Sequence, residues 1–281
     1  MQSSLVKIKT QRSLLFFCLL IWTAIILLPI LWAVISSFKT NQEFYELPWR
    51  LPAKAQWINY INAWKSAHIG HYFVNSILVT GLSLIFLLIL SSTSSYCISR
   101  MSFKGRGFLE STYIACMFVP SMFYLIPKFI LLNKLKLIDT HIGLVLVYST
   151  HGMCLAVMIL IGFFKTLPRA LEEAAIIDGA SHFRVFASIM FPLAKPGVIT
   201  VITLSFLNVW NEYVNALVML STPEKYTIPV GLLNLMEIQQ FRTDWGALFA
   251  GLIISMIPAL VIYISCQKYI TKGVAAGAVK G

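Results

Sequence analysis

The sequence predicts an all-α integral membrane protein with six transmembrane helices. Of its 281 residues, 58% are hydrophobic and only 12% are charged, which is about half the charged share of a soluble domain. Apolar runs of about 18 or more residues recur, and a helix of that length crosses a hydrocarbon core about 30 Å thick. Helices are expected because a strand with an unpaired edge is not stable in lipid. The expected spans are residues 13–37, 72–97, 110–133, 141–164, 197–220 and 246–267.

The first span is expected to stay in the membrane and not to be cleaved. Its apolar run from Leu14 to Phe38 is much longer than the hydrophobic region of a secretory signal, and no A-x-A cleavage site directly follows it. We therefore treat it as a transmembrane helix.

The positive charge of the chain predicts its orientation. The formal net charge is +11, which in a soluble protein would suggest a nucleic-acid partner. Here the basic residues favour one side of the membrane, including the short turn RMSFKGRG at Arg100–Gly107. Because cytoplasmic loops are enriched in Lys and Arg, both termini are expected in the cytoplasm, with no nucleic acid bound.

Three segments are then expected outside. Asn41–Ala67 carries several tryptophans and suggests interfacial structure. Lys134–Asp139 forms a short turn, and Ser221–Thr243 forms a longer loop. We divide the chain into an N-terminal helix with its external segment (1–71), a core (72–268) and a cytoplasmic tail (269–281).

The cytoplasmic loop at 166–195, between the fourth and fifth spans, predicts two short helices. Thr166 can cap the first helix, with Pro168 in its first turn. Asp178-Gly179 should interrupt this helix, because glycine tolerates the backbone geometry of a sharp turn. A second helix is expected from about His182 to Pro192. A helix lying on the membrane surface would favour basic over acidic residues on its polar face, so the Glu172-Glu173 pair disfavours that alternative.

This loop resembles the cytoplasmic EAA loop of permease subunits of ATP-binding-cassette importers. The matching residues are Glu173-Ala174-Ala175, Asp178-Gly179-Ala180, Ile189 and Pro192, with Phe191 in place of the more usual leucine. Other segments are similar to the smaller permease of maltose-type carbohydrate importers: Asn75-Ser76, Trp210-Asn211-Glu212-Tyr213 and the tail Ala276–Gly281. The similarity covers the chain from about Tyr72 onward.

The resemblance implies a type I importer permease fold and a subunit that couples ATP hydrolysis to transport. In the family the loop docks into the ATPase subunit, so the resemblance assigns coupling to Glu172, Glu173, Ala174, Ala175, Asp178, Gly179 and Ala180. It assigns a tail contact with the ATPase to Lys280 and Gly281. The implied partners are a second permease, two ATPase subunits, an extracytoplasmic solute-binding protein and membrane lipid, in a bacterial cell membrane. The implied cargo is a sugar, and a di- or oligosaccharide in particular.

Polar residues recur in the fifth span independently of this resemblance. Ser205, Asn208, Glu212 and Asn215 follow spacings of three, four and three, which would place them on one face of a helix. An acidic group in a span should face the bundle interior or a water-filled cavity. These residues and Asn211 therefore either line a translocation path or bond helices together, and the sequence favours neither.

Other polar residues predict less. Lys128, near the outer end of the third span, is expected to extend to the membrane interface. His68 and His71 lack carboxylate neighbours, so no metal site is expected. The cysteines show no CxxC spacing and are expected to be packing residues: Cys18, Cys97, Cys116, Cys154 and Cys266.

No catalytic motif is present. The chain has no Gly-Lys dipeptide, hence no phosphate-binding P-loop, and no HExxH or GxSxG motif. We expect a transport subunit that is not an enzyme and binds no cofactor, with ATP used by the partner ATPase. Two alternatives stay open: an importer of the same architecture for a polyol or a glycerol phosphate, and a membrane-embedded enzyme that uses Glu212.

Overall fold

The computed structural model describes residues 2–238 and 244–278, and within them the regular structure is helical, without a strand. Three helices are long and apolar enough to cross a membrane unbroken. They are Leu14–Ser36 within α1 (Gln2–Ser36), α4 (Ile69–Arg100), and Trp245–Lys268 within α15 (Trp245–Ala278).

Three further spans are bent. The first joins α5 (Arg106–Met117) to Ser121–Lys134, which contains η1 (Ser121–Tyr124) and α6 (Leu125–Lys134), at 100°. The second joins α7 (His141–His151) to α8 (Met153–Thr166) at 46°. The third joins His182–Leu193, which belongs to the loop expected at 166–195, to the apolar α12 (Lys195–Trp210) at 74°. Counting each bent pair as one span gives up to six, which agrees with the expected number and confirms the all-α fold.

Three expected spans differ from the structure. The expected helix 141–164 is interrupted at Gly152, where α7 and α8 meet at 46°. The expected helix 110–133 is broken, because Pro120 is extended (φ −60°, ψ 134°). Proline lacks a backbone N–H and disfavours the α conformation in the residue before it. The expected helix 197–220 ends at Trp210, and α13 (Val214–Met219) is a separate short helix.

The described residues form two compact units. One contains the residues up to Gly70 together with Leu232–Ser255, and the other contains His71–Gly231 together with the residues from Met256 onward. The remaining helices are α2 (Asn41–Glu46), α3 (Ile58–Lys65), α9 (Ala170–Ile177), α10 (His182–Val185), η2 (Phe186–Met190), α11 (Phe191–Leu193), η3 (Pro223–Lys225) and α14 (Ile228–Ile238).

Aromatic packing and buried hydrogen bonds stabilise the first unit. The Trp32 ring packs against Phe44, Trp49 and Phe249 at centroid distances of 5.2–5.9 Å. Lys39 is buried, and its Nζ donates to the carbonyls of Leu47 and Pro48 at 2.9 and 2.8 Å. The segment 41–67, expected outside the membrane, is therefore a folded part of the chain and not a free linker.

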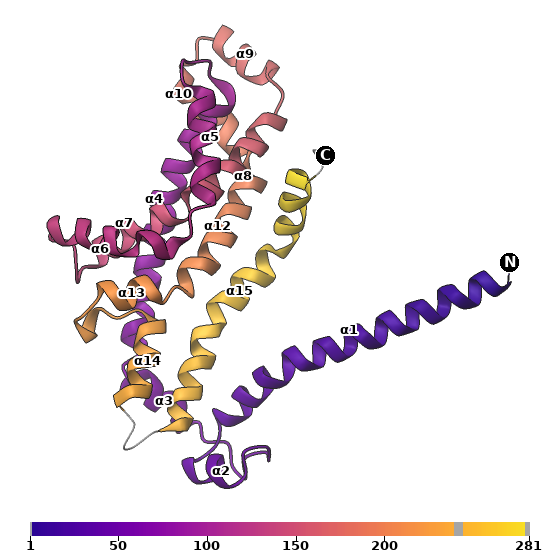
Figure 1. The fold of residues 1–281 in the computed structure, drawn as a ribbon, viewed down its shortest axis with the longest axis vertical. Coiled ribbons are helices and arrows are strands. Elements are labelled where there is room, and N and C mark those ends of the chain that lie inside the picture. The colour runs from indigo at the N-terminus through magenta and orange to yellow at the C-terminus, as the bar shows by residue number, and fades with distance from the viewer. Residues whose placement is uncertain (1, 239–243, 279–281) are drawn as a thin grey trace. The chain divides into compact units, whose positions relative to one another are not determined.

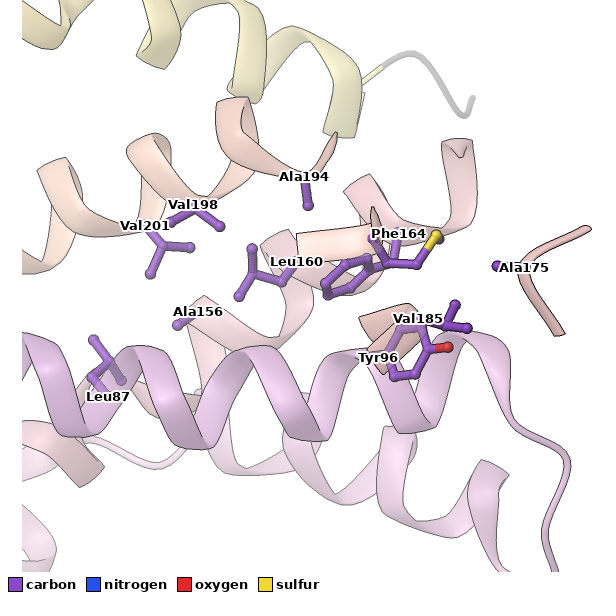
Figure 2. Close-up of a cluster of buried hydrophobic side chains, with 11 residues drawn as sticks. Leu87, Tyr96, Ala156, Leu160, Phe164, Ala175, Val185, Ala194, Val198 and Val201 are labelled. Atoms are coloured by element: carbon purple, nitrogen blue, oxygen red, sulfur yellow. The ribbon is translucent and has the colours of Figure 1, made fainter. Parts of the chain in front are cut away.

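The core of the second unit lies between α4, α8 and α12. Figure 2 shows Leu87 and Tyr96 of α4 pointing toward side chains of α8 and α12. The buried members of this cluster are Leu87, Tyr96, Ala156, Leu160, Phe164, Ala175, Val185, Met190, Ala194, Val198 and Val201. Because Ala175 and Val185 come from the loop between α8 and α12, the same core that joins the spans also anchors the loop.

Candidate functional site

The loop between α8 and α12 forms two short helices, as expected. α9 ends at Ile177, Asp178 is its C-cap, and Gly179 adopts φ +83°, a conformation that residues with a Cβ rarely adopt. The Ser181 hydroxyl accepts a hydrogen bond from the Arg184 N–H at 3.3 Å and caps α10. α9 and α10 lie together at one end of this unit, at the top of Figure 1.

Two details of this loop differ from the prediction. Thr166 does not cap a helix; it ends α8, and its hydroxyl donates to the Phe163 carbonyl at 2.7 Å. Leu167 is extended because it precedes Pro168, so α9 begins only at Ala170. The second helical run, His182–Leu193, ends one residue after Pro192, close to the expected end.

The loop residues expected to couple to an ATPase differ in their exposure. Glu173, Ala174, Asp178 and Gly179 are exposed, Ala180 is half-buried, and Ala175 is buried in the core. Several large apolar side chains of this loop are also exposed, and the two most exposed are Ile177 (85%) and Phe183 (75%). Carboxylates beside exposed apolar side chains make a surface suited to a protein partner.

Glu172 differs from its neighbour Glu173, because it faces the protein. Its Oε1 lies 3.2 Å from Arg100 Nε, and the two side chains are only 14% and 4% exposed. Burial raises the pKa of Glu172, and the nearby Arg100 guanidinium opposes that rise. Glu172 is therefore an internal ion-pair partner and not part of the exposed acidic surface.

The tail predicted to contact the ATPase is only partly described. Ala276–Ala278 continue α15. Lys280 and Gly281 lie outside the described residues.

A polar cavity lies in the second unit between α7, α8 and α12. Its volume is about 240 Å³. Its lining is Tyr148, His151, Gly152, Leu155, Ser205, Asn208, Val209 and Glu212. The cavity therefore combines hydroxyl, amide, imidazole and carboxyl groups with apolar walls.

Glu212 is the centre of the hydrogen bonds around this cavity. Its Oε2 accepts from the Tyr148 hydroxyl at 2.6 Å, and its Oε1 accepts from the Asn215 N–H and Nδ2 at 2.9 and 2.8 Å. The Ala216 N–H also donates to Oε2 at 3.3 Å. Because these N–H groups open α13, the Glu212 carboxyl occupies the position of a helix cap.

Lys128 completes this cluster and does not extend away from it. Its Nζ donates to Asn215 Oδ1 at 2.5 Å and lies 5.0 Å from the centre of the Tyr124 ring. The Tyr124 hydroxyl lies 3.3 Å from His151 Nδ1. The interfacial role expected for Lys128 is therefore wrong. The acidic residue Glu212 in the fifth span was the sequence feature that could have suggested an inward orientation for Lys128.

The predicted polar stripe is wrong as a helix face, but three of its members still meet at the cavity. Ser205 and Asn208 lie on α12, whereas Glu212 and Asn215 follow its end. Asn208 and Asn211 each donate Nδ2 to a carbonyl four residues earlier, at 2.9 and 2.8 Å. Asn211 is exposed and does not line the cavity. Tyr148 and His151 were not predicted, although their spacing of three residues in α7 places them on one helix face and could have found them.

A second polar cluster fixes the segment after α13. Asp139 Oδ1 accepts from the N–H groups of Ser221 and Thr222, both at 3.0 Å. Its Oδ2 accepts from the Thr222 hydroxyl at 2.5 Å and from Lys225 Nζ at 2.8 Å. Burial raises the pKa of Asp139, but these hydrogen bonds outweigh it and hold the pKa well below its usual range.

The start of α4 binds the same segment. Asn75 Nδ2 donates to the carbonyls of Glu224 and Tyr226, and the Ser76 hydroxyl accepts from the Ile228 N–H at 2.8 Å. His71 Nε2 lies 2.6 Å from the Glu224 carbonyl oxygen. Asn75-Ser76 therefore holds loop backbone, and His71 hydrogen-bonds to a carbonyl.

No metal centre is found in the part of the chain that the structure describes, where no three His, Cys, Asp or Glu side chains gather. The five cysteines are free thiols.

A family model matches residues 88–276, and its description is "binding-protein-dependent transport system inner membrane component". The diacetylchitobiose uptake system permease protein NgcG of Streptomyces coelicolor is 33% identical, covering 92% of this chain and 86% of NgcG. The trehalose/maltose transport system permease protein MalG of Thermococcus litoralis is 30% identical, covering 96% of this chain and 98% of MalG.

The fold is also that of a solved transporter chain. A chain in the crystal structure of a bacterial ABC transporter that imports the acidic polysaccharide alginate superposes with a TM-score of 0.79. Its identity is 22%, and the alignment covers 90% of this chain and 94% of that chain.

Proposed function

Because the chain belongs to the family of binding-protein-dependent transport system inner membrane components, we propose that it is the permease subunit of an ATP-driven sugar importer. The two relatives described above carry diacetylchitobiose and trehalose or maltose in their names. A di- or oligosaccharide is therefore the proposed cargo.

The observation that carries the coupling role is the loop of α9 and α10. Glu173 and Asp178 are exposed on its surface beside Ile177 and Phe183, while Ala175 is buried in the core between the spans. A partner that binds this surface can therefore move the spans. The proposed partner is an ATPase subunit whose basic groups meet the two carboxylates and whose cleft takes the apolar side chains. Ala174 allows close approach, and Gly179 permits the bend.

The proposed complex contains a second permease, two ATPase subunits and an extracytoplasmic solute-binding protein. ATP binds to the ATPase subunits and not to this chain. ATPase closure moves the loop, and the spans open toward the solute-binding protein in alternating access. The segment after α13, fixed by Asp139 and Asn75, is the proposed contact for that protein. The proposed site is a bacterial cell membrane, with both termini in the cytoplasm and Lys280 and Gly281 near the ATPase.

The polar cavity is the proposed part of the translocation path in this chain. Ser205, Asn208 and Glu212 line it, and hydroxyl-rich solutes need such donors and acceptors. Asn215 and Lys128 do not line the cavity. Asn215 donates to the Glu212 carboxyl and Lys128 donates to Asn215, so the proposed role of both is to hold Glu212 in place.

The coupling role is tested by purifying the tagged chain in mild detergent from its own cells and identifying the co-purified proteins by mass spectrometry. We expect a P-loop ATPase and a second multi-span protein. Glu173→Lys should lose the ATPase and sugar uptake, while Glu46→Lys, an exposed charge reversal in α2, should keep the ATPase. Wild-type uptake by Glu173→Lys would overturn the proposal.

The cargo is tested on the solute-binding protein encoded with this chain. Calorimetric titration with diacetylchitobiose, maltose, glycerol and glycerol 3-phosphate separates a sugar importer from a polyol or glycerol phosphate importer. Recovery of the chain without any ATPase in several detergents would favour the membrane-embedded enzyme instead.

A further inference from the structure

We propose that Arg100 and Glu172 are a positioning pair that fastens the coupling helix α9 to the cytoplasmic ends of α4 and α8. This inference rests on the proposed function, because it assigns different roles in coupling to different residues of the loop. Glu173 and Asp178 bind the ATPase, and Glu172 transmits the movement to the spans.

Arg100 is placed where three elements meet. It is the last residue of α4. Its Nη2 donates to the carbonyl of Phe164, near the end of α8, and to the carbonyl of Leu167 at 2.5 Å. Its Nε faces Glu172 of α9 at 3.2 Å. One guanidinium therefore contacts the ends of two spans and the coupling helix.

Burial makes this pair mutually dependent. Arg100 Nε and Glu172 Oε1 are buried, and neither has a hydrogen bond that would satisfy it apart from the ion pair. Removing one member of a buried pair leaves the other charge uncompensated, which is far more costly than removing both. The pair is thus held together whenever α9 is folded against the spans.

The neighbouring carboxylate provides the contrast. Successive residues of an α-helix point about 100° apart, so Glu172 faces Arg100 while Glu173 is exposed. Arg can hold two backbone carbonyls and a carboxylate at once because its guanidinium carries five donors in a fixed plane. A lysine at position 100 has only a single nitrogen and would lose part of this set.

The decisive experiment separates docking of the ATPase from transmission. The permease complex is purified with its ATPase from cells that express Glu172→Gln, Glu173→Lys or the wild-type residues, each with Asn208→Cys as a reporter and the native cysteines replaced. Labelling of Asn208→Cys by a charged maleimide is measured without nucleotide and with ATP plus vanadate. No sugar is needed for this measurement.

We expect Glu172→Gln to retain the ATPase but to lose the nucleotide-dependent change in labelling by about threefold or more, the size typical of a contact within a coupling network. Glu173→Lys should lose the ATPase itself. If Glu172→Gln responds to nucleotide like the wild type, or loses the ATPase as Glu173→Lys does, the positioning role is wrong. If Glu173→Lys keeps the ATPase, the proposed coupling function fails instead.

A double variant covers the case in which Glu172→Gln yields no folded chain in the membrane. Arg100→Gln with Glu172→Gln removes both buried charges, so the folded chain should be recovered with its ATPase, while the response to nucleotide stays weak. Arg100→Gln alone gives the remaining corner of the cycle. Strictly additive losses of thermal stability would show that the two residues do not act as a pair.

Discussion

The coupling loop and the Glu212 cluster both depend on glutamate side chains, but they distribute structural and functional roles differently. In the loop, one glutamate faces Arg100 inside the protein and the next is exposed. In the cluster, a single carboxyl accepts from Tyr148, caps α13 and lines the cavity. In the loop, therefore, one glutamate holds the helix against the protein and another is free for the proposed partner. In the cluster, the single carboxyl of Glu212 has both the structural and the proposed functional role.

This difference has a consequence for mutagenesis. Substitutions in the loop should separate activity from stability, because different residues carry the two. Substitutions at Glu212 should change both together. The following changes test that contrast through the thermal midpoint of the solubilised chain, from the largest expected effect to the smallest.

Glu212→Ala should be the most destabilising change, by about 3–5 kcal/mol, as when a buried polar network loses its central acceptor. The Tyr148 hydroxyl and the N–H of Asn215 would lose their acceptor. Midpoint temperature and uptake should fall together, measured by differential scanning fluorimetry and vesicle transport. Glu224→Ala, an exposed carboxylate, is the control. An unchanged midpoint with lost uptake would show that Glu212 acts on cargo alone.

Asp139→Asn should cost about 2 kcal/mol at pH 7, because Asp139 has as many donors as Glu212 but pairs with Lys225, which is 40% exposed. The folded-state pKa of Asp139 is depressed, so its contribution is present above the unfolded value of about 3.9 and is lost as pH falls below it.

The measurement is the thermal midpoint of both proteins from pH 7 to pH 3. The two curves should differ at pH 7 and approach one another below about pH 4. A constant difference across that range would mean that the charge of Asp139 contributes nothing.

Gly179→Ala should destabilise the coupling loop by about 1 kcal/mol, because φ is +83° while the space for a Cβ is open. Gly162→Ala is the matched control, since Gly162 is helical and equally open. That change should be neutral or stabilising. Urea denaturation in detergent measures both variants, and equal effects would contradict a role for backbone conformation.

Lys165→Gln should have the smallest effect, at most about 1 kcal/mol, because an ion pair near the surface contributes little. Lys165 Nζ lies 2.8 Å from Glu110 Oε1, and the side chains are 35% and 25% exposed. Midpoints measured at low and high salt should converge. If Lys165→Gln lowers the thermal midpoint as much as Glu172→Gln does, then the exposure of an ion pair does not determine its contribution to stability.

The sequence alone predicted the all-α fold, up to six spans and the two short helices of the loop at 166–195. Apolar length decides where a helix can cross a membrane, and the Asp178-Gly179 break depends on the backbone of glycine itself. These features are local, so periodicity and motif spacing are sufficient to find them. The identities of the sugar and the partners, and the division at residues 71 and 268, stay predictions.

Only the tertiary structure decided which carboxylates face inward. Glu172 and Glu173 are alike as a sequence pattern, and Arg100, 72 positions before Glu172 in the chain, separates them through its contacts with α8 and α9. Likewise, the spacing of the polar residues in the fifth span predicted one helix face. In the structure α12 ends at Trp210, and Asn215, beyond that end, contacts Lys128. The physical reason is that burial and ion pairing depend on residues distant in the chain, which no local pattern encodes.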